Sequence, residues 1–279
     1  MYIPIVNRFT CNSKQLSSYI KKLNKNSIKP IIDYVNENPS DFKSNYRTIK
    51  QTLNSHKKNH FAIKLSSLGL HLKDLECVKK DIFDLSETAI KNNSKVLIDA
   101  EYDSMFKDIN NISNDLMNEF NTEDVHIYKT YQMYRKDTMK EFIDDIKNDK
   151  NYYIGAKLVR GAYYNLDEKT GNLFEKIDYT HRAYNDAIKY FTYYSCDKDK
   201  LICATHNPKS NKLVEEYIKS DNDNIAIAHL LGMSDNLTDK YSKKNMEVFK
   251  YLPYGDLKET IPYLSRRLYE NYGILKYLY

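Results

Sequence analysis

Eight short runs rich in β-branched and aromatic residues recur along the chain, separated by longer segments with helical periodicity. Strands that alternate with helices predict a parallel sheet, and eight strands are the number that closes a barrel. The alternative is a doubly wound open sheet, but the sequence has neither G-x-G-x-x-G nor a P-loop, the usual nucleotide signatures of that fold. We therefore expect one α/β domain over residues 1–279, folded as a (β/α)8 TIM-like barrel. Its expected strands cover residues 30–35, 61–65, 96–100, 126–131, 153–159, 201–205, 225–230 and 248–251.

The composition of the chain argues against two classes of protein, nucleic-acid binders and transmembrane proteins. The 279 residues are 41% hydrophobic, which is enough to bury one large core. The formal net charge of +5 is mild, and basic and acidic residues are interspersed, which argues against nucleic-acid binding. No apolar run reaches the roughly 18 residues of a transmembrane helix, and the first residues lack the apolar core of a signal peptide. We expect a soluble chain with no nucleic-acid partner.

The cysteines indicate a reducing compartment. Cys11, Cys77, Cys196 and Cys203 form no C-x-x-C pair, and Cys203 lies in an apolar run where it should be a buried thiol. The sequence therefore predicts neither structural disulfides nor a bound metal.

Polar residues cluster at the C-terminal ends of the expected strands. A charge buried in a barrel mouth is costly unless it meets a partner, and barrel enzymes place their chemistry at this mouth. One strand-end lysine is typically a solvated cap, but polar residues on most strand ends predict a polar, anion-holding pocket. These residues are Lys64, Asp99, Lys129, Lys157, Thr205 and His206.

The last expected helix carries a second basic feature. Tyr263, Arg266 and Arg267 stand at i, i+3 and i+4, and so share one helical face. Two adjacent guanidiniums on that face can hold a carboxylate through charge-assisted hydrogen bonds. An exposed basic helix is the alternative interpretation of an Arg-Arg pair.

In chain order, these pieces resemble the proline dehydrogenase family, from about Val6 to Asn271. Any one piece is weak, but all of them in the right order at barrel spacing form a specific signal. The pieces are IDY at 32–34, IKLSSLG at 63–69, IDAE at 98–101, TYQ at 130–132, KLVRGAY at 157–163, ATHN at 204–207, LLGM at 230–233, YLPYG at 251–255 and YLSRRLYEN at 263–271.

The resemblance implies a substrate site for L-proline. It implies that the last helix lies over the C-terminal mouth and that Arg266 and Arg267, with Lys64, bind the proline carboxylate. It further implies that the other substrate-site residues wall the proline ring or line the pocket. The residues matching the ring wall are Leu230, Tyr251 and Tyr263, and those matching the pocket lining are Asp99, Ala162 and Tyr163.

The resemblance also implies FAD as cofactor, with Lys157 close to the flavin N5 and Val159 under the ring; strand alternation puts these two residues on one face. A turn formed by Thr205, His206 and Asn207 matches a flavin-contacting segment, as do Arg267 and Glu270 in the last helix. Lys129 occupies a flavin-facing position where many relatives have Gln or Asn; it either stabilises reduced flavin or turns away.

The implied reaction is hydride removal from the ring carbon next to nitrogen of L-proline, with delivery to FAD N5. The product is Δ1-pyrroline-5-carboxylate, and the electrons pass to a quinone, so peripheral contact with a respiratory membrane is expected. A separate pyrroline-5-carboxylate dehydrogenase chain would take the product. The expected location is cytoplasmic or peripheral on that membrane, or mitochondrial if a transit peptide was trimmed.

Two other functions stay open. A hydroxyproline dehydrogenase of the same superfamily is one, although Tyr263 argues against it because relatives that favour hydroxyproline look smaller there. The other is a catalytically silent barrel that serves as a scaffold; retention of the pocket residues argues against it.

Overall fold

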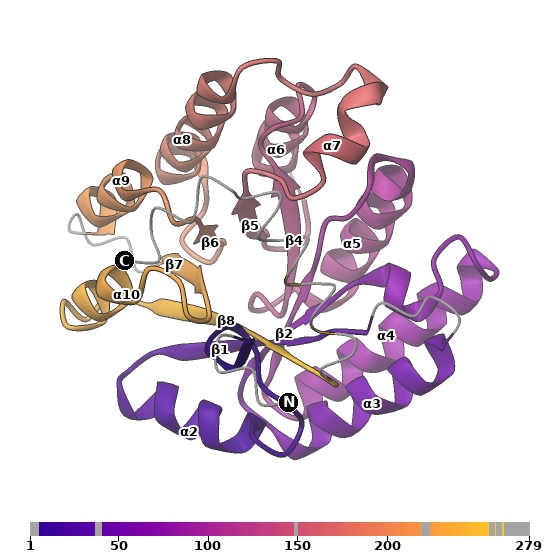
Figure 1. Cartoon of the computed structure of the whole chain (residues 1–279). Coiled ribbons are helices and arrows are strands. Elements are labelled where there is room, and N and C mark those ends of the chain that lie inside the picture. The colour runs from indigo at the N-terminus through magenta and orange to yellow at the C-terminus, as the bar shows by residue number, and fades with distance from the viewer. Residues whose placement is uncertain are drawn as a thin grey trace. The chain divides into compact units, whose positions relative to one another are not determined.

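The computed structural model describes residues 6–36, 41–147, 150–218, 224–256, 260 and 264. Its strands are all parallel where their pairing is defined, and they close into a barrel in sequence order, as predicted (Figure 1). The strands are β1 Lys29–Tyr34, β2 His60–Ile63, β3 Lys95–Ile98, β4 Ile127–Gln132, β5 Gly155–Val159, β6 Lys200–Ala204, β7 Ile225–Leu230 and β8 Val248–Tyr254.

Helices follow the strands in the expected alternation. The α-helices are α1 Val6–Phe9, α2 Leu16–Lys25, α3 Phe42–Ser55, α4 Leu75–Lys91, α5 Phe106–Phe120, α6 Thr138–Lys147, α7 Tyr164–Asp167, α8 Ile177–Tyr194, α9 Pro208–Ile218 and α10 Asp235–Ser242. The short 3-10 helices among the described residues are η1 Leu65–Leu68, η2 Asp103–Met105 and η3 Glu168–Thr170. None of the helices in the described part of the chain has the length and apolarity needed to span a membrane.

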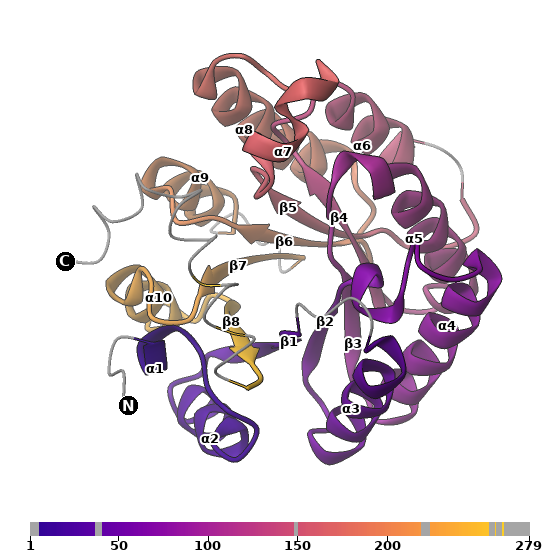
Figure 2. The ribbon, with the colours of Figure 1, turned by 45° about the vertical axis from the view of Figure 1, so that its right-hand side comes forward.

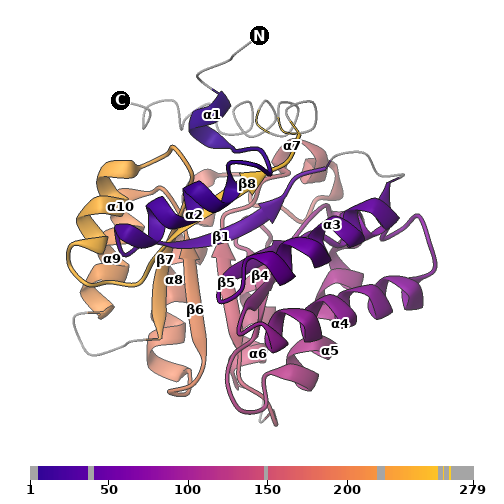
Figure 3. The same ribbon diagram turned by 90° about the horizontal axis from the view of Figure 1, so that it is seen from below.

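The chain divides into two compact units, which are described separately. The first comprises residues 1–96 and 228–279, and the second residues 97–227. In the first unit, β1 pairs in parallel with β2 and with β8, so that Asp33 lies opposite Ala62 and Pro253. Helices α3 and α4 of this unit pack side by side (Figure 3). The residue before α4, Asp74, is its N-cap, and its side chain accepts hydrogen bonds from the backbone N–H groups of Glu76 and Cys77.

In the second unit, β4, β5 and β6 are parallel neighbours, and register places Thr130 beside Lys157 and Lys157 beside Ile202. Helices α5 and α6 pack on β4, and α6 packs on α8 (Figure 2). Gly155 permits the close approach of β5 to β4, because a Cβ there would lie 2.1 Å from the carbonyl oxygen of Ile127.

The cysteines of the structure are free thiols, and Cys203 on β6 is fully buried as predicted. Burial raises the pKa of the Cys203 thiol well above its usual value, so this group is an unreactive part of the core.

Candidate functional site

In the second unit, a buried ion pair joins the middle of β5 to the residue that follows β3. The Lys157 ammonium donates a hydrogen bond to a carboxylate oxygen of Asp99, and the two side chains are only 4% and 9% exposed. A buried charge without its partner is strongly destabilising, so each of these groups depends on the other. The structure thus brings together two of the predicted site residues that are 58 positions apart.

An aromatic pair lies beside these strand ends. The ring of Tyr163, which is buried, meets the ring of Tyr102 edge-on, with 4.6 Å between the centroids and an interplanar angle of 60°. Val159 at the end of β5 and Ala162 are half-buried. Tyr102 was not among the predicted site residues, although an aromatic residue directly after the IDAE segment was a signal that could have identified it.

Arg160 organises the next turn of the chain. Its Nε donates to His181 Nδ1 at 2.9 Å, and its terminal nitrogens donate to Thr205 Oγ1 and, at 2.9 Å, to Ser210 Oγ. The guanidinium also lies 4.3 Å from the ring centroid of Tyr184. Arg160 therefore ties the end of β5 to the turn after β6, and sequence reasoning gave it no role although it belongs to the most specific segment.

The turn formed by Thr205, His206 and Asn207 begins α9. Thr205 is buried, and its Oγ1 accepts from the backbone N–H of Asn207 at 3.1 Å. The Asn207 side-chain oxygen accepts from the N–H groups of Lys209 and Ser210 at 2.9 and 3.3 Å, which makes Asn207 the N-cap of the helix. His206 is half-buried.

Lys129 is placed differently from the expected flavin-facing position. Its Nζ lies 2.6 Å from Glu141 and 2.8 Å from Asp145, both on α6, and 3.1 Å from the side-chain oxygen of Asn114 on α5. Neighbouring residues of a strand face opposite sides, and Thr130 rather than Lys129 is in register with Lys157. The Lys129 ammonium therefore lies among side chains of α5 and α6.

In the first unit, a second buried ion pair joins β1 to the end of β2. Lys64 Nζ lies 2.5 Å from a carboxylate oxygen of Asp33, and the side chains are 15% and 1% exposed. The carbonyl of Lys64 accepts from Ser67 Oγ at 2.6 Å, which fixes the start of η1. Asp33 belongs to the IDY segment but was not predicted as a site residue; its position on the strand next to Lys64 is the signal that was missed.

Leu230 and Tyr251 lie at neighbouring strands of the same unit. The N–H of Leu231 donates to the carbonyl of Tyr251 at 2.9 Å. Lys250 Nζ donates to the carbonyls of Leu230 and Met233 at 3.2 and 2.6 Å, so Lys250 holds the turn that follows β7.

The remaining predicted residues, Tyr263, Arg266, Arg267 and Glu270, lie outside the described residues, as does all but one residue of the helix expected to carry them. Among the residues that the structure does describe, no group of three or more His, Cys, Asp or Glu side chains is arranged to hold a metal ion.

A family model described as proline dehydrogenase matches residues 16–278. The chain is 30% identical over 205 residues to Proline dehydrogenase 1, mitochondrial, of Drosophila melanogaster, an alignment that covers 65% of this chain and 30% of that protein. It is 28% identical over 209 residues to Hydroxyproline dehydrogenase of Xenopus laevis, covering 69% of this chain and 45% of the relative. The chain thus spans less than half the length of these relatives.

The fold matches a crystal structure of proline utilization A (PutA) from Bdellovibrio bacteriovorus inactivated by N-propargylglycine. The TM-score is 0.87 at 16% identity, and the match covers 96% of this chain and 32% of the other. At this level of identity, the similarity establishes the barrel fold.

Proposed function

Since the chain belongs to the proline dehydrogenase family, we propose that it oxidises L-proline to Δ1-pyrroline-5-carboxylate with FAD as its cofactor, in a single catalytic barrel domain. The observation that carries the proposal is the family match over residues 16–278. The Lys157–Asp99 and Lys64–Asp33 pairs support it, because largely buried charge in the strands of a barrel and in the loops that follow them is typical of a site that binds a charged ligand.

The side chains around the end of β5 suit FAD. Lys157 and Arg160 supply positive charge there, and Thr205 supplies a hydroxyl that accepts a hydrogen bond from Arg160. We propose that Lys157, Val159 and the Thr205, His206 and Asn207 turn hold the cofactor, together with Arg267 and Glu270. When bound, FAD supplies the hydride acceptor for the reaction. Lys129 is left out of this set because its ammonium is bound among helix residues.

The proposed proline site combines a carboxylate clamp with an apolar wall. Lys64, Arg266 and Arg267 bind the substrate carboxylate, and the Asp33 carboxylate keeps the Lys64 ammonium oriented at the strand end. Fixing the substrate at its carboxylate and at its ring confines the carbon that loses hydride to one position, which lowers the entropic part of the barrier. The residues proposed to wall or line the pocket are Asp99, Ala162, Tyr163, Leu230, Tyr251 and Tyr263.

The electrons are proposed to pass to a quinone, which places the enzyme in peripheral contact with a respiratory membrane during turnover, from the cytoplasm or inside a mitochondrion. A separate pyrroline-5-carboxylate dehydrogenase chain would take the product.

The second candidate is oxidation of hydroxyproline, which the similarity to the Xenopus laevis hydroxyproline dehydrogenase favours. The two substrates differ by one ring hydroxyl, and an apolar wall formed by Leu230, Tyr251 and Tyr263 would leave that hydroxyl without a partner. Such a site rejects the more polar substrate because a desolvated hydroxyl without a hydrogen bond costs about 1–3 kcal/mol. We therefore propose proline as the preferred substrate.

Anaerobic titration of the purified, FAD-saturated protein tests the proposal. We expect L-proline to bleach the flavin absorbance, trans-4-hydroxy-L-proline to do so much more slowly, and a quinone analogue to restore the colour. D-proline serves as the control for stereospecific binding. A protein that binds FAD but is not reduced by either substrate would contradict the proposed activity, and one that binds no FAD would favour the scaffold alternative.

A further inference from the structure

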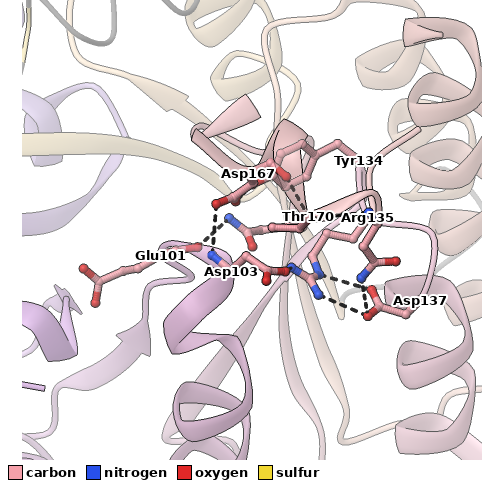
Figure 4. A network of polar contacts seen from close by, with 9 residues as sticks. Glu101, Asp103, Tyr134, Arg135, Asp137, Asp167 and Thr170 are labelled. Carbon is pink, nitrogen blue, oxygen red and sulfur yellow. Dashed lines mark hydrogen bonds and ion pairs between the residues drawn. The ribbon is translucent and has the colours of Figure 1, made fainter. Parts of the chain in front are cut away.

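In the second unit, a polar network joins three loops that follow three successive strands (Figure 4). We call five residues of this network, Asp103, Tyr134, Arg135, Asp137 and Asp167, the loop clamp. Asp103 begins η2 after β3, Tyr134, Arg135 and Asp137 follow β4, and Asp167 ends α7 after β5. Loops after strands carry the functional residues of a barrel, so contacts among them bear on the site.

Arg135 forms the first half of the loop clamp. Its guanidinium donates in a bidentate manner to Asp137, with both N–O distances at 3.1 Å, and also to Asp103. It lies 3.7 Å from the ring centroid of Phe106, and the side chain is only 4% exposed. Burial alone would lower the pKa of Arg135, but the hydrogen bonds to Asp137 and Asp103 outweigh burial and raise it. The first and second loops are therefore joined by a permanently charged group.

Asp167 forms the second half. One of its carboxylate oxygens accepts from the Tyr134 hydroxyl at 2.6 Å, and the other accepts from the backbone N–H of Asp103 at 3.0 Å. Asp167 is 3% exposed. Burial and the neighbouring Asp167 raise the pKa of Tyr134 far above its usual value, so its hydroxyl stays protonated and remains a donor. Asp167 thus ties the third loop to both of the others.

The backbone of the third loop is fitted to Tyr134. Gly161 has a φ of +133°, and a Cβ there would lie 2.2 Å from the Tyr134 ring. The N–H of Tyr134 donates to the carbonyl of Arg160 at 2.8 Å, and the N–H of Phe174 donates to the carbonyl of Tyr134 at 2.9 Å. Both ends of the segment 161–174 therefore contact Tyr134, and Asp167 lies between them in the sequence.

Two aromatic residues, Tyr102 and Tyr163, lie close to the loop clamp in the sequence. Tyr102 directly precedes Asp103, and its ring packs on Tyr163, which lies between Gly161 and Asp167. We propose that Asp167, with Tyr134 and Arg135, is a positioning residue that fixes the Tyr102–Tyr163 pair at the ends of β3 and β5 and so sets the affinity of the substrate pocket. This inference rests on the proposed function and assigns Tyr102 to the wall of the same pocket.

Two conservative variants test the loop clamp. Tyr134→Phe removes only the hydroxyl that Asp167 accepts from, and Asp167→Asn keeps the shape of the side chain while removing its charge. Glu168→Gln, an exposed carboxylate next to Asp167, is the matched control. Hydrogen–deuterium exchange by mass spectrometry should show faster uptake in residues 101–106 and 161–174 together in both variants, while the α8 peptides and the control stay unchanged.

The kinetic readout separates positioning from a general loss of structure. In the FAD-saturated variants, we expect KM for L-proline to rise about five- to tenfold, the size of one lost buried hydrogen bond, with kcat within about twofold and FAD content unchanged. Because both changes break the same contact, the free-energy effect of the double variant Tyr134→Phe/Asp167→Asn should be smaller than the sum of the two single effects.

The outcomes of these experiments distinguish failure of the positioning role from failure of the proposed function. Faster exchange confined to one loop, or an unchanged KM with both loops loosened, would overturn the positioning role. If the wild-type protein does not oxidise proline, the proposed function fails, and coupled exchange of the two loops then decides whether the clamp exists. Should Asp167→Asn fail to fold, Tyr134→Phe alone carries both measurements.

Discussion

The Lys157 ammonium donates a hydrogen bond to Asp99, and the two buried groups link the middle of β5 to the residue directly after β3. The positive charge assigned to the flavin site is therefore partly compensated within the protein before any ligand binds. Its effect on a bound cofactor depends on both residues, because removing either one leaves the other as an uncompensated buried charge.

Lys157→Met should retain FAD but lower its reduction potential and slow its anaerobic reduction by proline. A fixed positive charge favours the cofactor form that carries more negative charge, by electrostatic preorganisation. Asp99→Asn keeps the ammonium and removes its counter-charge, so it should shift the potential in the opposite direction. A redox titration without substrate, with stopped-flow reduction alongside, measures both effects. Loss of FAD from Lys157→Met, with normal reaction of the remaining flavoprotein, would instead identify Lys157 as an anchor.

Arg266→Ala should raise KM for proline while the flavin content stays near that of the wild type. The expected loss of one charge-assisted contact to the carboxylate is about 1.5–3 kcal/mol, which corresponds to roughly a 10- to 150-fold rise. Lys212→Ala, at an exposed position on α9, is the control for a change of net charge. Steady-state kinetics of the fully flavinated protein make the measurement, and an unchanged KM would remove Arg266 from the carboxylate clamp.

Tyr263→Ser should shift the preference from proline toward hydroxyproline. Loss of the phenol ring opens space, and the serine hydroxyl offers a hydrogen-bond partner to the substrate hydroxyl. The ratio of kcat/KM for the two substrates is the quantity to compare, and Tyr263→Phe, which retains the ring, should leave it near the wild-type value. Equal ratios in all three proteins would show that Tyr263 does not wall the ring.

Barrel architecture was predictable because each strand carries its own local signal. All eight expected runs are strands, with ends displaced by a few residues. The fate of Lys129 was not predictable, because Ile127–Gln132 is buried on every residue and shows no alternation that would reveal which side faces the helices. Strand register decides that side, and register depends on contacts distant in sequence.

The partners of the strand-end lysines were missed for a related reason. Asp33 lies 31 positions from Lys64, and Asp99 lies 58 positions from Lys157. The family resemblance implies ligand-binding roles for Lys64 and Lys157, but it does not specify which carboxylate forms an ion pair with each of them. Arg160 and the loop clamp likewise depend on how loops after different strands approach each other, which no periodicity within one strand or helix encodes.

Lys129→Met should strongly destabilise the fold. Burial alone would raise the pKa of Asp145, but the ammonium groups of Lys129 and Lys150 outweigh burial and hold it below the usual value. Burial raises the pKa of Glu141, and Lys129 offsets only part of that effect. The variant leaves both carboxylates without the Lys129 ammonium, which is 1% exposed. We expect a loss of about 3 kcal/mol in the free energy of unfolding, at the low end for a broken buried pair because Lys150 still contacts Asp145.

The sign of the pH dependence distinguishes this electrostatic loss from a packing defect. In the wild type, the pKa of Asp145 is lowered in the folded state. Its contribution to the free energy of unfolding is therefore present above the usual pKa range of a carboxyl group and is lost as the pH falls through its folded-state pKa. Without Lys129, the folded-state pKa values of Asp145 and Glu141 should rise above their unfolded values. Acidification then neutralises both carboxylates in the native state and reduces the loss of stability caused by the substitution. The difference in stability between the two proteins should therefore shrink from about pH 8 to about pH 5. Urea unfolding at both pH values, with FAD held constant and Lys140→Met at an exposed position of α6 as control, measures it. A deficit that is independent of pH would mean that Lys129 acts through packing of its aliphatic stem rather than through its charge.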